Sequence, residues 1–294
     1  MGQSHHHNHS NKNLKIAFFL NLAFTIVEVI AGLYVNSIAI LADAIHDAGD
    51  SLSLGTAWYL QKKSNKAPNK KYSYGYRRFS LLGALINCTI LIGGAIYAII
   101  ESIERFIQPT IPDAKGMMWF AFLGILVNGY AAWKLSTGKS INEKVVSWHL
   151  VEDVLGWVAI LIVAIVLQFK EIAYLDPILS LLITIYILWN SIKKLIETLF
   201  IFLQGKPTEI DKEEIIKNIT SVKGILSTHD THIWSLDGEH HVFTTHVKLD
   251  NVSSITEVIA IKSEIKNIIS KYSFEHYTIE TDFKDEFCDF AKEL

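Results

Sequence analysis

Two apolar stretches of the sequence each carry a histidine and an aspartate four residues apart. His46 and Asp50 lie in SIAILADAIHDAGDSLSLG, and His149 and Asp153 lie in VVSWHLVEDVLGWVAILIVAIVLQF. Residues four apart share one face of an α-helix, so each pair presents an imidazole nitrogen and a carboxylate oxygen in the same direction. Two such helices face to face would supply two nitrogens and two oxygens, which suits tetrahedral Zn²⁺.

The alternative to a metal site is polar packing. His46 and His149 would then be hydrogen-bonded packing residues, and the aspartates would cap other polar groups. A carboxylate in the middle of a bilayer costs ~3 kcal/mol on insertion scales, so it needs a partner or a wet cavity. Two copies of one spacing on separate segments favour the metal site. Asp43, three residues before His46, is predicted to orient the other ring nitrogen of His46.

Other polar residues in these stretches are interpreted as lining or packing residues. Asp47 is rotated by about 100° from His46 on a helix, so it is expected to line a cavity or an interface. The same role is predicted for Glu152. Polar packing, or a position at the mouth of the site, is expected for Asn21, Glu28 and Asp176.

Hydropathy defines the elements that position the two pairs. Half of the 294 residues are apolar, and they are concentrated in residues 14–203, whereas residues 205–294 are rich in charge. A hydrocarbon core of ~30 Å needs about 20 apolar helical residues. The sequence therefore predicts a six-helix transmembrane domain over residues 14–204. Its expected spans are residues 14–35, 37–60, 79–103, 117–135, 145–169 and 175–196.

Lysine and arginine in the short loops predict the orientation. The loop at residues 61–78 holds seven basic residues and no acidic residue, and further lysines surround the loop after the fourth span. The alternate loops contain almost none. Because cytoplasmic loops are enriched in Lys and Arg, both termini are expected in the cytoplasm. Residues 1–13 then form a His-rich cytoplasmic tail, and residues 205–294 a soluble cytoplasmic domain. The net charge of −3 gives no reason to expect a nucleic-acid partner.

The C-terminal region has the pattern of a small α+β domain. Helices are predicted at residues 208–222 and 255–272, and strands at residues 224–235, 241–249 and 277–283. This α-β-β-α-β order forms a layer of helices on a sheet. His240 and His241 follow Asp237-Gly238, a hairpin-turn signal, so both are expected to be exposed.

Four separated motifs resemble those of the cation diffusion facilitator (CDF) family of zinc-transporting membrane proteins. They are DAIHDAGDSLSLG, YSYGYRRFSLLGALIN, HLVED and HDTHIWSLDGEHHVFTTHVKL, which occur in the family's order over nearly the whole chain. The resemblance implies that His46, Asp50, His149 and Asp153 form the transport site. The paired His-xxx-Asp form is similar to the zinc-selective branch. The resemblance also implies a ferredoxin-type, metallochaperone-like cytoplasmic domain that forms a homodimer.

The same resemblance implies a regulatory metal site in the cytoplasmic domain. His229 and His246 match family ligand positions, Glu280 stands where a third ligand is expected, and Asp282 is the fourth candidate. His232 is an equal rival to His229. Two departures matter: the loop at residues 70–78 lacks metal ligands, and the single Cys288 argues against a cysteine ligand.

The histidines at residues 5–9 are interpreted as a low-affinity zinc collector, or in part as a purification scar. A histidine-rich loop between spans four and five, typical of eukaryotic relatives, is absent from the sequence. Its absence favours a bacterial exporter in the cytoplasmic membrane.

Zinc/proton antiport is the expected function, because protons and Zn²⁺ compete for the same imidazoles. Cadmium, cobalt or iron(II) could be carried by the same mechanism. Two other classes compete: an intramembrane metallohydrolase, which needs an open metal position and a general base, and a zinc sensor with the same ligands. The zincin His-Glu-xx-His signature is missing, so no enzyme is predicted.

Overall fold

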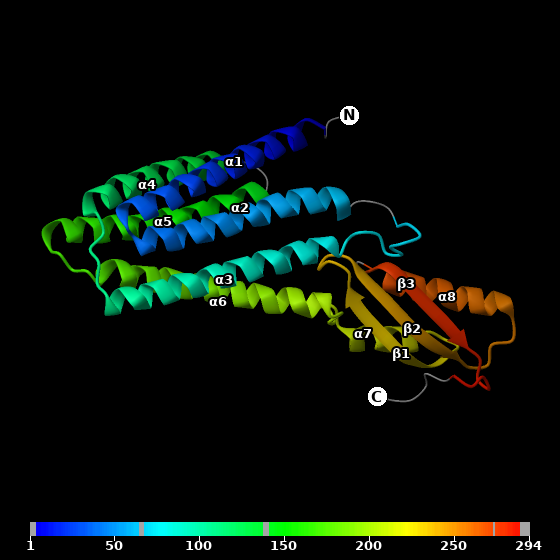
Figure 1. Cartoon of the computed structure of the whole chain (residues 1–294). Coiled ribbons are helices and arrows are strands. Elements are labelled where there is room, and N and C mark those ends of the chain that lie inside the picture. Colours follow the sequence, from blue (N-terminus) through cyan, green and yellow to red (C-terminus); the bar gives the residue numbers. More distant parts are fainter. Residues whose placement is uncertain (1–3, 65–67, 138–140, 273, 289–294) are drawn as a thin grey trace. The chain divides into compact units, whose positions relative to one another are not determined.

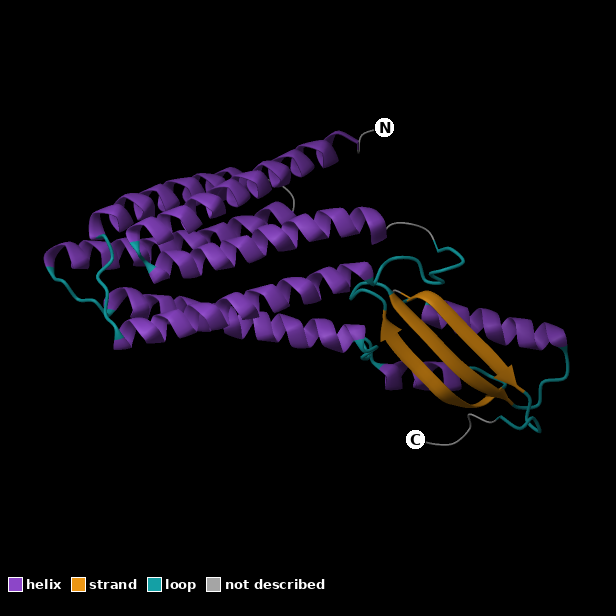
Figure 2. Ribbon diagram, viewed as in Figure 1, coloured by secondary structure: helices purple, strands orange, loops and turns teal. Residues whose placement is uncertain are grey.

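The computed structural model describes residues 4–64, 68–137, 141–272 and 274–288. The chain packs as two units: one holds Met1–Leu60 and Gly83–Leu195, and the other holds Gln61–Leu82 and Ile196–Leu294. Six long helices come first along the chain (Figures 1 and 2). They are α1 (Ser4–Val35), α2 (Ile38–Ser64), α3 (Phe79–Ile107), α4 (Ala114–Ser136), α5 (Ile141–Phe169) and α6 (Leu175–Phe202).

Five of these helices are long and apolar enough to cross a membrane: α1, α3, α4, α5 and α6. The second helix, α2, does not meet the same composition and carries Asp43, Asp47 and Asp50 within eight residues. Ionisable residues in a membrane helix usually face a partner or a wet cavity. The helix with the least apolar sequence is therefore the place to look for chemistry.

Helices α1, α4 and α5 pack on one another (Figure 1). Their shared core includes Phe24, Met117, Ala121 and Trp157. The rings of Phe24 and Trp157 meet edge to face with centroids 5.7 Å apart. A Cβ at Gly124 would overlap the Trp157 indole, so glycine is needed for the close approach of α4 and α5.

The start of α2 is capped by a side chain from α6. Asp176 accepts hydrogen bonds from the Ile38 amide at 2.8 Å and from the Ser37 hydroxyl at 2.5 Å. The first amides of a helix have no partner within the helix, so a carboxylate there satisfies them. This contact agrees with the polar packing role predicted for Asp176, and it ties the helix that carries His46 to α6.

The second unit contains an α+β domain, as predicted. Its elements are α7 (Lys212–Thr220), β1 (Ile225–Ser235), β2 (His241–Leu249), α8 (Ile255–Ile269) and β3 (Phe274–Asp282). The strand order is β1-β2-β3, with β1 antiparallel and β3 parallel to β2. The last strand begins at Phe274, three residues before the predicted start.

Alternation along β2 separates a core face from a polar face of the sheet. Phe243 and Val247 point to the same face and pack with isoleucines of the two helices, among them Ile219 and Ile265. Successive strand residues point to opposite faces, so Thr244 and His246 lie on the other side of the sheet. That second face carries most of the histidines considered below.

His241 departs from the sequence prediction. It is 8% exposed, although its place after the hairpin turn predicts exposure. As the first residue of β2 it pairs with Ser235 of β1 and Phe274 of β3, so it lies between two strands. Because β2 is the central strand, the strands on both sides cover its first residue.

Candidate metal centres

Helices α2 and α5 bring their histidine–aspartate pairs together. His149 Nε2 lies 2.5 Å from Asp50 Oδ2, and His46 Nε2 lies 3.5 Å from the same oxygen. The two imidazole rings have centroids 5.5 Å apart and meet at 80°. Ligand atoms of His46, Asp50 and His149 all lie within 4.8 Å of one another. The side chains predicted from two separate segments thus converge on one carboxylate.

Asp153 belongs to the same centre but sits at its edge. Its Oδ1 is 4.0 Å from His46 Nε2, and it lies outside the closer group of three. Its side chain is buried, whereas those of His46 and His149 are 23% and 35% exposed. The carboxylate of Asp153 therefore forms the buried part of the centre, and the two imidazoles form its accessible part.

The predicted orienting role of Asp43 is not supported by the geometry. Within the described part of the chain, neither His46 Nδ1 nor Asp43 Oδ2 has a hydrogen-bond partner. Asp43 Oδ1 instead lies near Gly156 of α5, 3.6 Å from where a Cβ would stand there. The carboxyl is thus directed towards the neighbouring helix and not along its own helix to the imidazole three residues later.

Glu152 is closer to an orienting role than Asp43. Its Oε2 lies 3.8 Å from His149 Nδ1, although the side chain is 61% exposed. A carboxylate at the second ring nitrogen fixes the tautomer of a metal-binding histidine. Glu152 could have been predicted from the sequence, because it lies three residues from His149. A three-residue spacing was used as a sequence signal only for Asp43 and His46.

The second cluster of candidate ligands lies on the sheet of the C-terminal domain. Strand pairing sets His229 opposite His246, and His246 opposite Glu280. Asp282 Oδ2 lies 3.2 Å from His229 Nε2 and 3.3 Å from His246 Nδ1. Three of the four predicted residues therefore meet at one carboxylate.

Glu280 lies at the margin of this cluster. Its Oε2 is 3.6 Å from His246 Nε2, and its side chain is 63% exposed. The closest group of four consists of His229, His246, Asp282 and Cys288. Glu280 faces the opposite ring nitrogen of His246 from the one that Asp282 contacts, which explains its separation from the group.

Cys288 is the ligand candidate that the sequence interpretation set aside. Its Sγ lies 3.5 Å from His246 Nδ1. The sequence did offer a signal for this ligand. Cys288 follows Asp282, the last residue of β3, by six residues, and a segment of that length can fold back to the end of the strand. His232, the rival of His229, instead contacts Asp230 at 2.8 Å and lies outside the group.

The histidines at residues 5–9 belong to α1, but their side chains fall outside the described ones. The predicted zinc collector is therefore not tested by this geometry.

Comparison with known proteins identifies both parts of the chain. Residues 14–203 match the cation efflux transmembrane domain, and residues 207–283 match the cytoplasmic domain of cation efflux proteins. The Bacillus subtilis cadmium, cobalt and zinc/H(+)-K(+) antiporter is 32% identical over 284 residues, covering 95% of this chain and 91% of the relative.

Two further relatives cover similar lengths. The metal cation efflux system protein CzcD of Cupriavidus metallidurans is 32% identical over 286 residues, with 95% of this chain and 90% of the relative covered. The zinc transporter ZitB of Escherichia coli is 29% identical over 296 residues, with 97% and 93% covered. Both family matches and this coverage confirm the resemblance read from the motifs: the chain belongs to the cation efflux (cation diffusion facilitator) family of membrane transporters.

Proposed function

We propose that this transporter exports zinc from the cytoplasm in exchange for protons. The observation that carries the proposal is the convergence of two imidazoles on Asp50, with Asp153 beside them. His46, Asp50, His149 and Asp153 would bind the ion as cargo during transport. The centre has two features that a transport site needs, since its histidines are partly exposed and its ligands come from two different helices.

Ligand chemistry favours zinc among the divalent ions. Imidazole nitrogen and carboxylate oxygen in equal number suit four-coordinate Zn²⁺, whereas an all-oxygen site suits harder ions. The four residues include no thiolate, which softer cadmium would prefer. Cobalt and cadmium remain the competing cargoes. The Bacillus subtilis relative is named for cadmium, cobalt and zinc, whereas the Escherichia coli relative is named for zinc alone.

Proton exchange is supported by the contact between His149 and Asp50. His149 Nε2 lies within hydrogen-bond distance of Asp50 Oδ2, and a hydrogen bond between an imidazole and a carboxylate requires a proton on the imidazole nitrogen or on the acid. A metal needs both atoms deprotonated, so its binding displaces that proton. The same two atoms would therefore carry metal in one direction and a proton in the other. The Bacillus subtilis relative is named as an antiporter of protons.

The cytoplasmic cluster is proposed as a second, regulatory zinc site in a homodimer. His229, His246, Asp282 and Cys288 supply nitrogen, oxygen and sulfur donors that suit zinc. Zinc bound there would report the cytoplasmic concentration to the transport domain. We infer that the transporter lies in the cytoplasmic membrane of a bacterium, with both termini and the α+β domain on the cytoplasmic side. The bacterial origin of the relatives and the basic loop at residues 61–78 support this inference.

Zinc flux into proteoliposomes tests the transport proposal. The full-length protein is reconstituted with a zinc-sensitive dye inside the vesicles, and flux is recorded with and without an imposed pH gradient. Zinc entry should depend on the gradient and should be lost in His149→Ala and Asp50→Ala. Glu104→Gln is the matched control, because Glu104 is an exposed carboxylate of α3 without an ion pair among the described residues.

Wild-type flux in His149→Ala or Asp50→Ala would overturn the site. Zinc binding without flux in the wild-type protein would instead identify a sensor. Zinc flux that is the same with and without the pH gradient would be consistent with the metal site but would contradict the proposed exchange for protons.

A further inference from the structure

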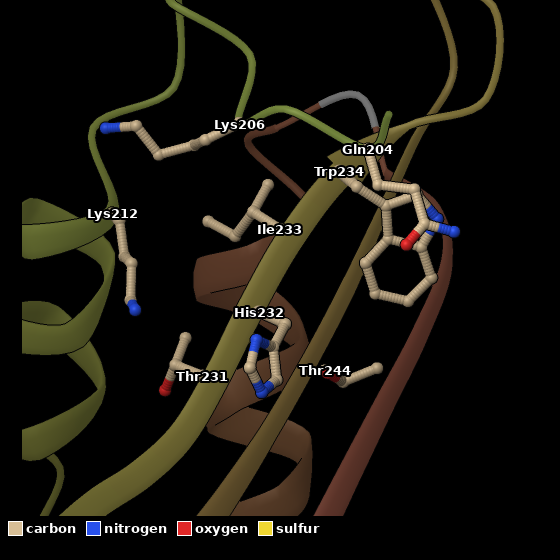
Figure 3. A pocket seen from close by; sticks show the side chains of 8 residues that line it. All are labelled: Gln204, Lys206, Lys212, Thr231, His232, Ile233, Trp234 and Thr244. Atoms are coloured by element: carbon tan, nitrogen blue, oxygen red, sulfur yellow. The ribbon is translucent and has the colours of Figure 1, made fainter. Parts of the chain in front are cut away.

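Two neighbouring pockets of the second unit meet at Gln204 and Trp234. The first, of about 490 Å³, is lined by Lys206, Lys212 and His232 besides these two residues (Figure 3). The second, of about 360 Å³, is lined by the loop before α3. It contributes three more cations, Lys71, Arg77 and Arg78. The name basic groove is used below for the pair of pockets and their five basic residues, Lys71, Arg77, Arg78, Lys206 and Lys212.

Four of the five cations of the basic groove are not compensated by a carboxylate within the described residues. Neither pocket has a carboxylate in its lining. Arg77 pairs with Glu275 at 2.7 Å and with Asp237 at 3.8 Å. The other four cations have no acidic partner within 4.0 Å among the residues that the structure describes. Four unpaired cations around two connected pockets favour an anionic ligand.

This charge stands out from the rest of the domain. Residues 205–294 contain ten lysines, no arginine and seventeen acidic residues, so the domain as a whole is acidic. Lys206 and Lys212, two of those ten lysines, line the same pocket, and the basic loop at residues 68–78 adds the others. The concentration of cations is therefore local and cannot be ascribed to a basic domain.

Chain connectivity puts three residues of the two pockets close to the ends of two long helices. Arg78 directly precedes α3, and Gln204 and Lys206 follow the end of α6 by two and four residues. These helices have 29 and 28 residues, hence lengths of about 42–44 Å, against a hydrocarbon core of ~30 Å. The excess of about 12–14 Å is enough for a helix end to reach the headgroup layer, where phosphate is the abundant anion.

The neutral side chains of the groove suit the same location. Trp234, Tyr72 and Tyr74 line the pockets, and aromatic rings with a polar edge are favoured at the membrane–water interface. Gln204 adds an amide donor between the two groups of cations. Lysine ammonium and the planar guanidinium of arginine both donate to phosphate oxygens, and arginine does so in a fork.

We propose that the basic groove binds a phosphate group, supplied either by an anionic phospholipid headgroup or by a soluble phosphate ester. Lys206 and Lys212 contact it from one pocket and Arg78 from the other, with the Trp234 ring between them. The ligand joins the loop that follows α2 to the strand that carries His229, so its presence holds together two segments of this unit. The proposal does not depend on which metal is transported.

The test uses the full-length protein and two probes. In the first arm, native mass spectrometry counts phosphatidylglycerol retained from micelles that also contain phosphatidylcholine. In the second arm, inorganic phosphate is titrated into protein in neutral detergent, and calorimetry records binding. The variant is Arg78→Gln with Lys206→Gln and Lys212→Gln. The matched control is Lys217→Gln with Lys223→Gln and Lys271→Gln, three lysines outside the pockets.

The groove variant should lose phosphate binding by about 10²-fold, since each cation near an anionic surface adds several-fold. The control should bind as the wild type does. Loss in the first arm alone identifies a lipid, and loss in the second a soluble ester. Lys206→Arg with Lys212→Arg keeps the charge and should retain binding, which separates charge loss from misfolding. Absence of binding in both arms, or equal loss in the control, overturns the proposal.

Discussion

The two candidate metal centres use similar residue types on different supports. In the membrane domain, four side chains come from two helices, and only the packing of α2 on α5 brings them together. In the cytoplasmic domain, His229 and His246 are neighbours in a hydrogen-bonded sheet, and Asp282 follows from the next strand. Backbone ladders fix the second centre, whereas side-chain packing fixes the first.

This difference matches the two proposed tasks. A transport site must release its ion, so it needs elements that can move apart by small shifts in helix packing. A regulatory site must report a concentration, which requires ligands held at constant distances.

The largest expected effect is the loss of transport in Asp50→Asn. Asp50 is the one oxygen donor close to both membrane histidines, and the amide cannot supply the negative charge that offsets the ion. Zinc flux in proteoliposomes should fall by at least about 10²-fold. Asp282→Asn removes the corresponding oxygen of the cytoplasmic centre and should change the maximal flux by less than about 3-fold. Equal losses in the two variants would erase the distinction between the centres.

The next effect is on zinc affinity in the cytoplasmic centre. Asp282→Ala should weaken zinc binding there by about 10²-fold, because both histidines lose their shared carboxylate. Binding is measured by competition with a chelating dye, in a background where Asp50→Ala and Asp153→Ala remove the membrane site. Thr278→Ala, on the same strand, is the control and should bind as its parent does. Unchanged affinity after Asp282→Ala would exclude this cluster as the second site.

A smaller effect separates the two candidates for the fourth ligand. Cys288→Ser should lower the affinity of the cytoplasmic centre by about 10-fold, since the hydroxyl is a poor substitute for a thiolate. Glu280→Gln should change it by less than 2-fold, given its exposed side chain. The same dye competition compares the two variants. The reverse ranking would restore the ligand set read from the sequence and remove Cys288 from it.

The sequence allowed residues on the same face of one helix to be predicted. Contacts between different helices or strands could be predicted only in part. The i, i+4 rule placed His46 with Asp50 and His149 with Asp153, and the structure brings His46, Asp50 and His149 within 4.8 Å of one another, with Asp153 4.0 Å from His46. The i, i+3 spacing of Asp43 and His46 did not lead to a contact in the structure, because a helix face has width and the carboxyl turns towards Gly156. Periodicity defines a direction on a helix, but neighbouring helices decide where a flexible side chain ends.

The sheet shows the same limit. The order of helices and strands along the chain and their approximate bounds followed from periodicity and turn residues, so the α+β architecture was predictable. The burial of His241 was not, because alternation does not say which strand is central. The approach of Cys288 to His246 depends on a return of the chain after β3, for which no periodic signal exists. Irregular segments carry ligands that pattern analysis misses.

The smallest expected effect concerns His241 and tests how the cytoplasmic domain responds to acid apart from its metal ligands. Burial lowers the pKa of the His241 imidazole, so the folded domain favours its neutral form. The unfolded chain takes up a proton near the ordinary value of about 6.5, hence this residue stabilises the fold above that pH. The stabilisation is lost as the pH falls through the lower pKa of the folded state.

His241→Gln should therefore flatten the fall in Tm of the metal-free protein between pH 7.5 and pH 5.5. His232→Gln is the control, because the side chain of His232 is 54% exposed and close to Asp230. Differential scanning fluorimetry of the full-length protein in chelator measures both variants against the wild type. If His232→Gln flattens the profile and His241→Gln does not, the acid response of the domain belongs to its exposed histidines, and burial at the centre of the sheet has no part in it.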